Sequence, residues 1–171
     1  MAVTNNGQSV QSLQLIDTRT EKILDNEIIP VSWYGLKFSS DEKFLYASGG
    51  NDNIILKYAI MNNKFQLNDT IRLGKKWPVK ISPTGIEIDD AAKLLYVVTK
   101  ENNSLYVIDL TSKSIIKELP LGNEAYDCLL SPYKKELYIS IWGGDKVVVF
   151  VTQIKLVTAE IEVGDIPTNC C

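Results

Sequence analysis

The segment Lys93-Leu94-Leu95-Tyr96-Val97-Val98-Thr99 decides the fold, because its beginning occurs three times along the chain. The other two copies are Lys43-Phe44-Leu45-Tyr46 and Lys135-Glu136-Leu137-Tyr138, so that the three leucines lie 50 and 42 residues apart. Met1-Ala2-Val3-Thr4 joins the series, since it aligns with Leu45-Tyr46-Ala47-Ser48 at a spacing of 44 residues. The sequence therefore predicts a repeat of 42 to 50 residues, the length of a four-stranded propeller blade.

Each repeat reads as four short strands. Apolar residues two apart precede each Leu-Tyr pair and predict a first strand with one buried face: Leu36 and Phe38, Ile86 and Ile88, Cys128 and Leu130. A polar hairpin turn leads into the second strand, which carries the Leu-Tyr pair. A Gly/Asn/Asp-rich turn precedes the third strand, as in Leu105–Ile108 and Val147–Phe150. The fourth strand closes on Leu73-Gly74, Leu121-Gly122 or Val163-Gly164, and no long helical periodicity is present. The chain is predicted to be all-β.

The wording of the repeats resembles the YVTN-repeat β-propellers (YncE-like). The resemblance is carried by Ala2-Val3-Thr4-Asn5-Asn6, Leu95-Tyr96-Val97-Val98-Thr99 and the ending Val163-Gly164-Asp165-Ile166-Pro167. It implies a partial β-propeller of about three and a half to four four-stranded antiparallel blades. The expected units are residues 1–34, 35–84, 85–126 and 127–167, with 168–171 beginning a further inner strand. It also implies an extracytoplasmic parent protein, in some bacteria one with a phosphatase-like domain, although the chain shows no signal peptide.

Fewer blades than the usual four to eight leave two interpretations of the ring. The favoured one is a fragment of a larger propeller. In the other, the C-terminal strand pairs with the first blade and closes a small ring. An open arc would expose sheet edges, which predicts self-association.

The composition excludes several classes of function. The chain has no histidine among 171 residues, which removes Ser-His-Asp and Cys-His catalytic sets and histidine-ligated zinc or haem. A net charge of −3 provides no basic surface for nucleic acid, and no apolar run approaches the ~20 residues that span a bilayer. No cofactor is expected.

Aromatic and cationic residues are expected in the loops around the channel mouth. Trp33 and Trp77 fall on links between repeats, Trp142 falls in a second-to-third-strand turn, and Tyr34 and Tyr126 precede first strands. Lys76 lies beside Trp77 in the longest link. These six residues are the predicted site for a flat or anionic ligand or a peptide partner. The alternative is that the aromatic side chains only pack between blades.

Other polar motifs have a structural interpretation first. Asp89-Asp90 falls in a first-to-second-strand hairpin, where aspartate forms turns, although paired carboxylates also serve acid–base chemistry. Asn51-Asp52-Asn53 resembles part of a calcium loop but lacks the closing glutamate. Cys128 and Cys170 share one repeat position and are expected to be small buried residues, with no metal or redox motif.

The function favoured by the sequence is a non-catalytic module that binds a ligand or protein partner through its channel-mouth loops. The alternative is part of a lactonase-like or phosphoesterase-associated propeller enzyme whose catalytic residues lie outside this chain. A third interpretation is a truncated chain without a function of its own.

Overall fold

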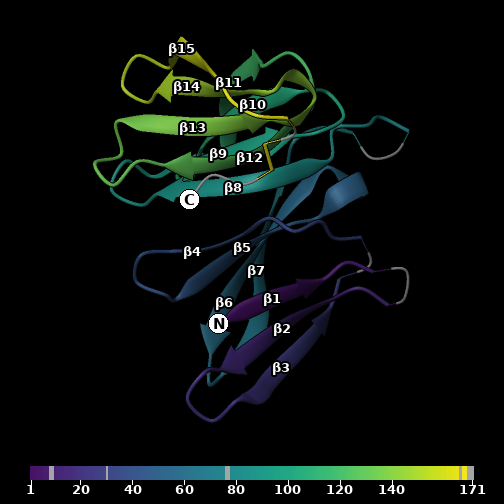
Figure 1. Cartoon of the computed structure of the whole chain (residues 1–171). Coiled ribbons are helices and arrows are strands. Elements are labelled where there is room, and N and C mark those ends of the chain that lie inside the picture. The colour runs from purple at the N-terminus through teal and green to yellow at the C-terminus, as the bar shows by residue number, and fades with distance from the viewer. Residues whose placement is uncertain (8–9, 30, 76–77, 166, 169–171) are drawn as a thin grey trace. The chain divides into compact units, whose positions relative to one another are not determined.

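The computed structural model describes residues 1–7, 10–29, 31–75, 78–165 and 167–168. The chain divides into two compact units, Met1–Pro83 and Thr84–Cys171, which are described separately here (Figure 1). Each unit contains two antiparallel sheets whose strands follow one another in sequence order. Neighbouring strands pair because short turns join them, as expected for antiparallel hairpins.

The first unit holds seven strands. The sheet β1-β2-β3 has three strands and the sheet β4-β5-β6-β7 has four. Their bounds are β1 Ala2–Asn5, β2 Ser12–Asp17, β3 Lys22–Ile28, β4 Leu36–Phe38, β5 Phe44–Ser48, β6 Ile54–Met61 and β7 Lys64–Arg72. A short 3-10 turn, η1 (Gly50–Asp52), stands between β5 and β6. Ala2 pairs with Leu15 as Tyr46 pairs with Lys57, so β1 has the place in its sheet that β5 has in the next.

The two sheets of the first unit share one core. Leu13 and Ile29 from the first sheet region pack with Leu45, Tyr58 and Phe65 from the second. All five side chains are buried, and the Tyr58 and Phe65 rings meet edge to face at 5.7 Å. A hydrogen bond also joins the outer strands, since the Phe65 N–H donates to the Asp25 carboxylate at 2.8 Å.

The second unit repeats this design with two four-stranded sheets, β8-β9-β10-β11 and β12-β13-β14-β15. The bounds are β8 Pro83–Asp89, β9 Leu94–Thr99, β10 Ser104–Asp109, β11 Ser114–Pro120, β12 Ala125–Leu130, β13 Glu136–Ile141, β14 Lys146–Val151 and β15 Leu156–Glu162. A second 3-10 turn, η2 (Trp142–Gly144), stands between β13 and β14.

The core of the second unit is built from alternate residues of the middle strands. Tyr96 and Val98 of β9 pack against Leu137 and Ile139 of β13, and the Phe150 ring meets the Tyr96 ring edge to face at 6.2 Å. Cys128, which is 4% exposed, joins this cluster as the small buried residue that the sequence predicted. The predicted alternation of apolar residues is thus what fills the space between the sheets.

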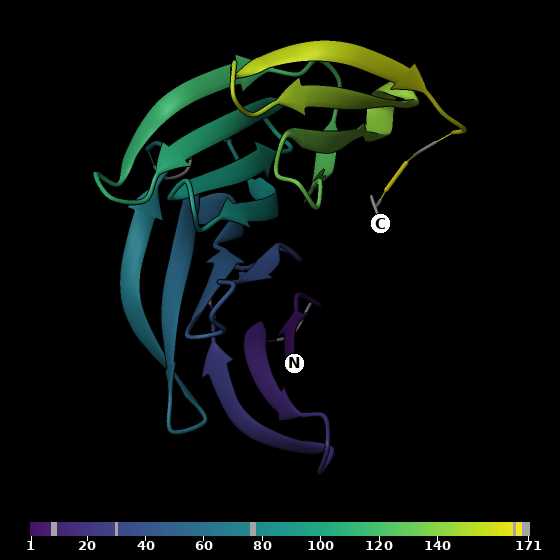
Figure 2. The same ribbon diagram turned by 90° about the vertical axis from the view of Figure 1, so that its left-hand side faces the viewer.

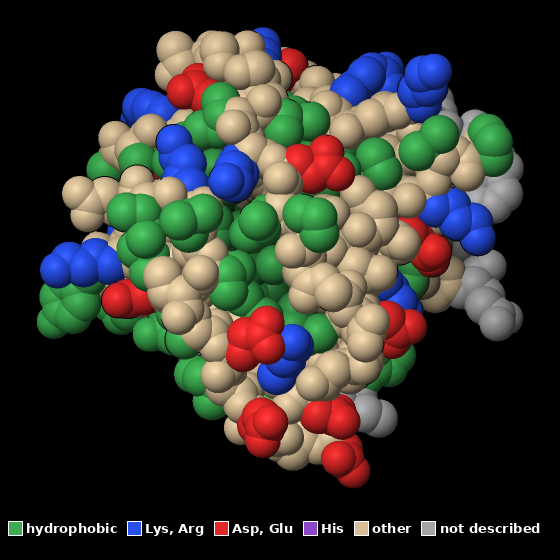
Figure 3. All heavy atoms as spheres, turned by 90° about the horizontal axis from the view of Figure 1, so that it is seen from above, with side chains coloured by type: hydrophobic (Ala, Val, Ile, Leu, Met, Phe, Trp, Pro, Cys, Tyr) green, Lys and Arg blue, Asp and Glu red, His purple; other side chains and the backbone are tan. Residues whose placement is uncertain are grey.

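The last strand of each sheet is the most exposed. Every residue of β15 is exposed, including Leu156 and Ile161, and β15 runs along the outer edge of its sheet (Figure 2). Hydrophobic side chains appear at the surface between charged ones in the view from above (Figure 3). Within the described ranges, no helix is both long and apolar enough to cross a membrane.

Candidate ligand-binding site

One residue position organises the loop end of every sheet. It stands immediately before the third strand and is filled by Gln11, Asn53, Asn103 and Asp145. Its carbonyl accepts a hydrogen bond from the residue after the fourth strand, at 2.8 to 3.1 Å: Ile29, Leu73, Leu121 and Val163. Asn53, Asn103 and Asp145 have positive φ values of 49° to 56°, which Asn and Asp tolerate best among side-chain-bearing residues. The loop is therefore fastened to the start of the following link.

The side chain at this position also holds the link in the first unit. Asn53 is completely buried, and its amide nitrogen donates to the carbonyls of Lys75 and Val79 at 2.7 and 2.6 Å. Its amide oxygen accepts from the N–H groups of Ile81 and Ser82, both at 3.0 Å. Asn53 therefore serves as a structural fastener, and its amide is fully used without a metal ion.

Sequence reasoning missed this position as a repeat feature. Gln11, Asn53, Asn103 and Asp145 are spaced by 42, 50 and 42 residues. The last two intervals are those of the Leu-Tyr pairs, so the signal was present. It was obscured because Asn53 stands in a Gly/Asn/Asp run that resembles part of a calcium loop.

Loops of this kind enclose a cavity of about 150 Å³ in the first unit. Its lining residues are Asn6 and Gln11 from the β1–β2 connection, Val31, Ser32 and Trp33 from the β3–β4 link, and Asn51 from η1. The cavity thus takes residues from three loops that are separate in sequence. The predicted site residue Trp33 is one of its walls.

The position of Trp33 depends on Gly50. A Cβ added at Gly50 would lie 2.6 Å from Cδ1 of the Trp33 ring, so any side chain there would displace the ring. Gly50 also has a φ of +47°, which glycine adopts without strain. The glycine turn that the sequence analysis treated only as a strand connection therefore seats the indole.

A second cluster lies at the loop end of the second unit. The rings of Tyr126 and Trp142 are 5.4 Å apart, and the Lys100 ammonium lies 4.6 Å from the centre of the Trp142 ring. Lys100 belongs to the β9–β10 turn and Trp142 to η2, so two sheets contribute. The Trp142 indole nitrogen is buried and has no hydrogen-bond partner within the described ranges.

The six predicted site residues have different outcomes. The structure brings Tyr126 and Trp142 together, and it places Trp33 and Tyr34 on the β3–β4 link as expected. Tyr126 is the second residue of β12 rather than a residue before it, because β12 begins at Ala125 with an irregular pairing to β13. Lys76 and Trp77 lie outside the described residues. The prediction that all three tryptophans share one channel mouth stays a prediction.

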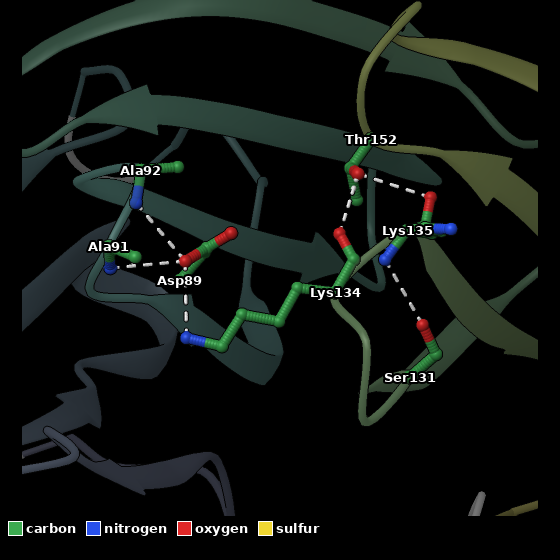
Figure 4. Close-up of polar contacts among 7 residues, drawn as sticks. All are labelled: Asp89, Ala91, Ala92, Ser131, Lys134, Lys135 and Thr152. Carbon is green, nitrogen blue, oxygen red and sulfur yellow. Dashed lines mark hydrogen bonds and ion pairs between the residues drawn. The ribbon is translucent and has the colours of Figure 1, made fainter.

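The acidic motif is a turn, as the structural interpretation predicted. One Asp89 carboxylate oxygen accepts hydrogen bonds from the Ala91 and Ala92 N–H groups at 3.1 Å each, and from the Lys134 ammonium at 3.1 Å (Figure 4). Over the part of the chain that the structure describes, no three His, Cys, Asp or Glu side chains are grouped to hold a metal ion. Cys170 and Cys171 lie outside the described residues.

Four antiparallel sheets of consecutive strands define the class of the protein as an all-β, partial β-propeller, and known structures agree. The chain is similar to the periplasmic gluconolactonase PpgL of Pseudomonas aeruginosa, with a TM-score of 0.74 and 17% identity over 98% of this chain and 52% of that one. It is also similar to the hydrazine synthase of Kuenenia stuttgartiensis, with a TM-score of 0.67 and 19% identity over 88% of this chain and 42% of that one.

At these identities the likeness concerns the fold. The chain spans about half the length of these neighbours or less. No protein-family model matches the sequence. No curated protein matches it either.

Proposed function

We propose that this chain is a β-propeller module of the YVTN-repeat type that binds a ligand or a protein partner through the loops at the ends of its second and fourth strands. The cavity beside Trp33 carries the proposal, because three loops that do not contribute to a common strand pair converge on it. Binding sites in proteins are typically such concave places, with an aromatic wall and a few polar groups.

The aromatic pair of the second unit supports the same use of the loops. Tyr126 and Trp142 lie against each other, and Lys100 contributes a positive charge over the indole. The buried Trp142 indole nitrogen is a donor that a bound acceptor would satisfy. Aromatic and cationic groups in this arrangement suit an anionic group or a peptide.

Thermal denaturation with a panel of compounds tests the proposal. The panel contains neutral sugars, sugar acids, sugar lactones and short peptides of either charge. A compound that binds the folded chain raises its Tm. We expect at least one class to do so, and we expect Trp33→Ala or Trp142→Ala to abolish that shift.

Tyr133→Ala is the matched control. Tyr133 is 85% exposed and belongs to the β12–β13 turn, at the other end of β13 from Trp142. Its replacement should leave the ligand-induced shift intact. A panel with no shift, or a shift lost equally in the control, would contradict the proposal.

A second candidate function is part of a lactone-hydrolysing propeller. It is favoured by the structural likeness to a gluconolactonase over nearly the whole chain. Its catalytic groups would lie outside these 171 residues or among carboxylates that bind a divalent ion. Hydrolysis of gluconolactone by the purified chain, measured with and without added Mg²⁺, Ca²⁺ or Zn²⁺, tests it. Activity above the spontaneous rate, lost on chelation, would favour the enzyme.

A further inference from the structure

The cavity beside Trp33 is lined only by uncharged side chains. Its polar walls are the amides of Asn6, Gln11 and Asn51 and the hydroxyl of Ser32, and its apolar walls are Val31 and Trp33. An anionic ligand held without a cation would lose its hydration for little return. The lining therefore favours a neutral ligand that has many oxygen atoms.

The amides of the cavity turn donors toward other partners. The Oε1 atom of Gln11 accepts the Ser32 N–H at 2.6 Å, and Oδ1 of Asn51 accepts the Ser82 hydroxyl at 3.3 Å. Both acceptor atoms are thereby engaged within the protein, whereas the two donors of each amide are on its nitrogen. Hydroxyl, ether and carbonyl oxygens are the groups that such nitrogens bind.

Ser32 supplies an independent observation. Its residue is 5% exposed, and its hydroxyl oxygen is buried with no hydrogen-bond partner among the residues that the structure describes. A buried hydroxyl without a partner costs stability and commonly marks a place that another molecule completes. Because Ser32 lines the cavity, a ligand hydroxyl inside it is in position to pair with this group.

The size and shape of the cavity set the class of ligand. A cavity of about 150 Å³ is known to accept a single six-membered ring. The indole of Trp33 offers such a ring a flat apolar surface, held in place by the close contact with Gly50. One face of a sugar or cyclitol ring consists of C–H groups that pack on an aromatic surface, while its hydroxyls point toward the edges.

We propose that this cavity binds a neutral, polyhydroxylated ring compound of monosaccharide size. The proposal rests on the function proposed above and specifies its ligand at one site. The ring packs on Trp33, its oxygens accept hydrogen bonds from the amides of Asn6, Gln11 and Asn51, and one hydroxyl pairs with Ser32.

Titration of the 171-residue chain by NMR tests this, with the indole N–H signal of Trp33 as the reporter. The probes are methyl α-glucopyranoside and myo-inositol, with glucuronate as the matched anionic ring and a short peptide as a further class. We expect the neutral rings to shift the Trp33 signal in a saturable manner. Ser32→Ala should weaken their binding about 5-fold, the effect of one ordinary hydrogen bond, without lowering Tm.

Asn6→Ala is the second variant, because Asn6 is exposed and its replacement leaves the fold intact. It should weaken binding to a similar degree, whereas Trp142→Ala in the other unit should have no effect on the Trp33 signal. If glucuronate or the peptide binds at Trp33 and the neutral rings do not, the proposed ligand class is wrong and the proposed function stands. If no class of probe binds at either tryptophan, both are wrong.

Discussion

At the scale of single residues, a buried amide in one repeat does what a ligand-binding motif was suspected of doing. The Asn53 side chain makes four hydrogen bonds to backbone groups 22 to 29 residues away, all of them in the link that follows β7. Asn103 has the same place before the third strand and a similar φ of 49°, but its Oδ1 atom is buried and lacks a partner within the described ranges. Two residues of one type in one repeat position therefore differ in what they stabilise.

Replacement of the two asparagines separates backbone conformation from side-chain bonding. Asn53→Ala should lower the free energy of unfolding by about 4 kcal/mol, since it loses four buried hydrogen bonds in a left-handed position. Asn103→Ala, which shares the backbone cost, should lower it by about 1–2 kcal/mol. Urea unfolding measures both. Equal losses would show that the backbone conformation alone is responsible.

At the scale of elements, the inner strands of the second unit approach each other through a glycine. A Cβ added at Gly85 of β8 would lie 2.8 Å from the Asp127 Cα and 2.8 Å from the Cys128 nitrogen, both backbone atoms of β12. Backbone atoms of a paired strand move only when the strand moves. The glycine two residues into β8 thus sets how closely the two sheets of this unit pack.

Gly85→Ala should therefore destabilise the chain, by about 2–3 kcal/mol as for other overpacked sites. Gly7→Ala is the matched control, because a Cβ at Gly7 has no neighbour within 4 Å, and it should change stability by less than about 0.5 kcal/mol. Thermal and urea unfolding measure the difference. Similar stabilities for the two variants would mean that the sheets separate without cost.

The hairpin turns of the same unit are connected by an ion pair. Asp89 caps its own turn and receives the Lys134 ammonium from the β12–β13 turn, with side chains 10% and 39% exposed (Figure 4). Asp89→Ala should cost about 2 kcal/mol, mostly through the turn, and Lys134→Met about 0.5–1 kcal/mol because solvent screens the exposed lysine. A double-mutant cycle should show coupling of about 0.5–1 kcal/mol. Additive effects would show that the pair contributes nothing.

At the scale of the whole molecule, buried phenols in both units link stability to alkaline pH. Burial raises the pKa of Tyr58, Tyr96 and Tyr106 to about 12 from the ordinary value of 10. Nearby carboxylates act in the same direction: Glu27 for Tyr58, Asp89 for Tyr96 and Glu118 for Tyr106. The folded chain therefore keeps protons that the unfolded chain has lost between pH 10 and 12.

The free energy of unfolding should fall as the pH rises from 10 to 12, because the unfolded state binds fewer protons in this interval. The contribution is fully present below pH 10. Urea midpoints measured from pH 9 to 12 test the prediction. Tyr96→Phe should make the decline shallower, and Tyr133→Phe, at an exposed position, should leave it unchanged. A decline as steep in Tyr96→Phe as in the parent chain would contradict the assignment.

The sequence by itself determined the strands, their order and their turns. Each strand pairs with its neighbour in the chain, so alternating apolar residues around Leu45, Leu95 and Leu137 and a polar turn between strands contain the necessary information. Turn chemistry is equally local: Asp89 caps N–H groups only two and three residues away.

Only the tertiary structure decided which loop residues meet. The cavity combines Asn6 and Gln11 with Trp33 and with Asn51, residues that no local periodicity relates. The burial of the Ser32 hydroxyl and the contact of the Trp33 ring with Gly50 depend on how two sheets pack. The sequence identified Trp33 as a residue of interest, but its surroundings arise from long-range packing, which a one-dimensional repeat pattern does not specify.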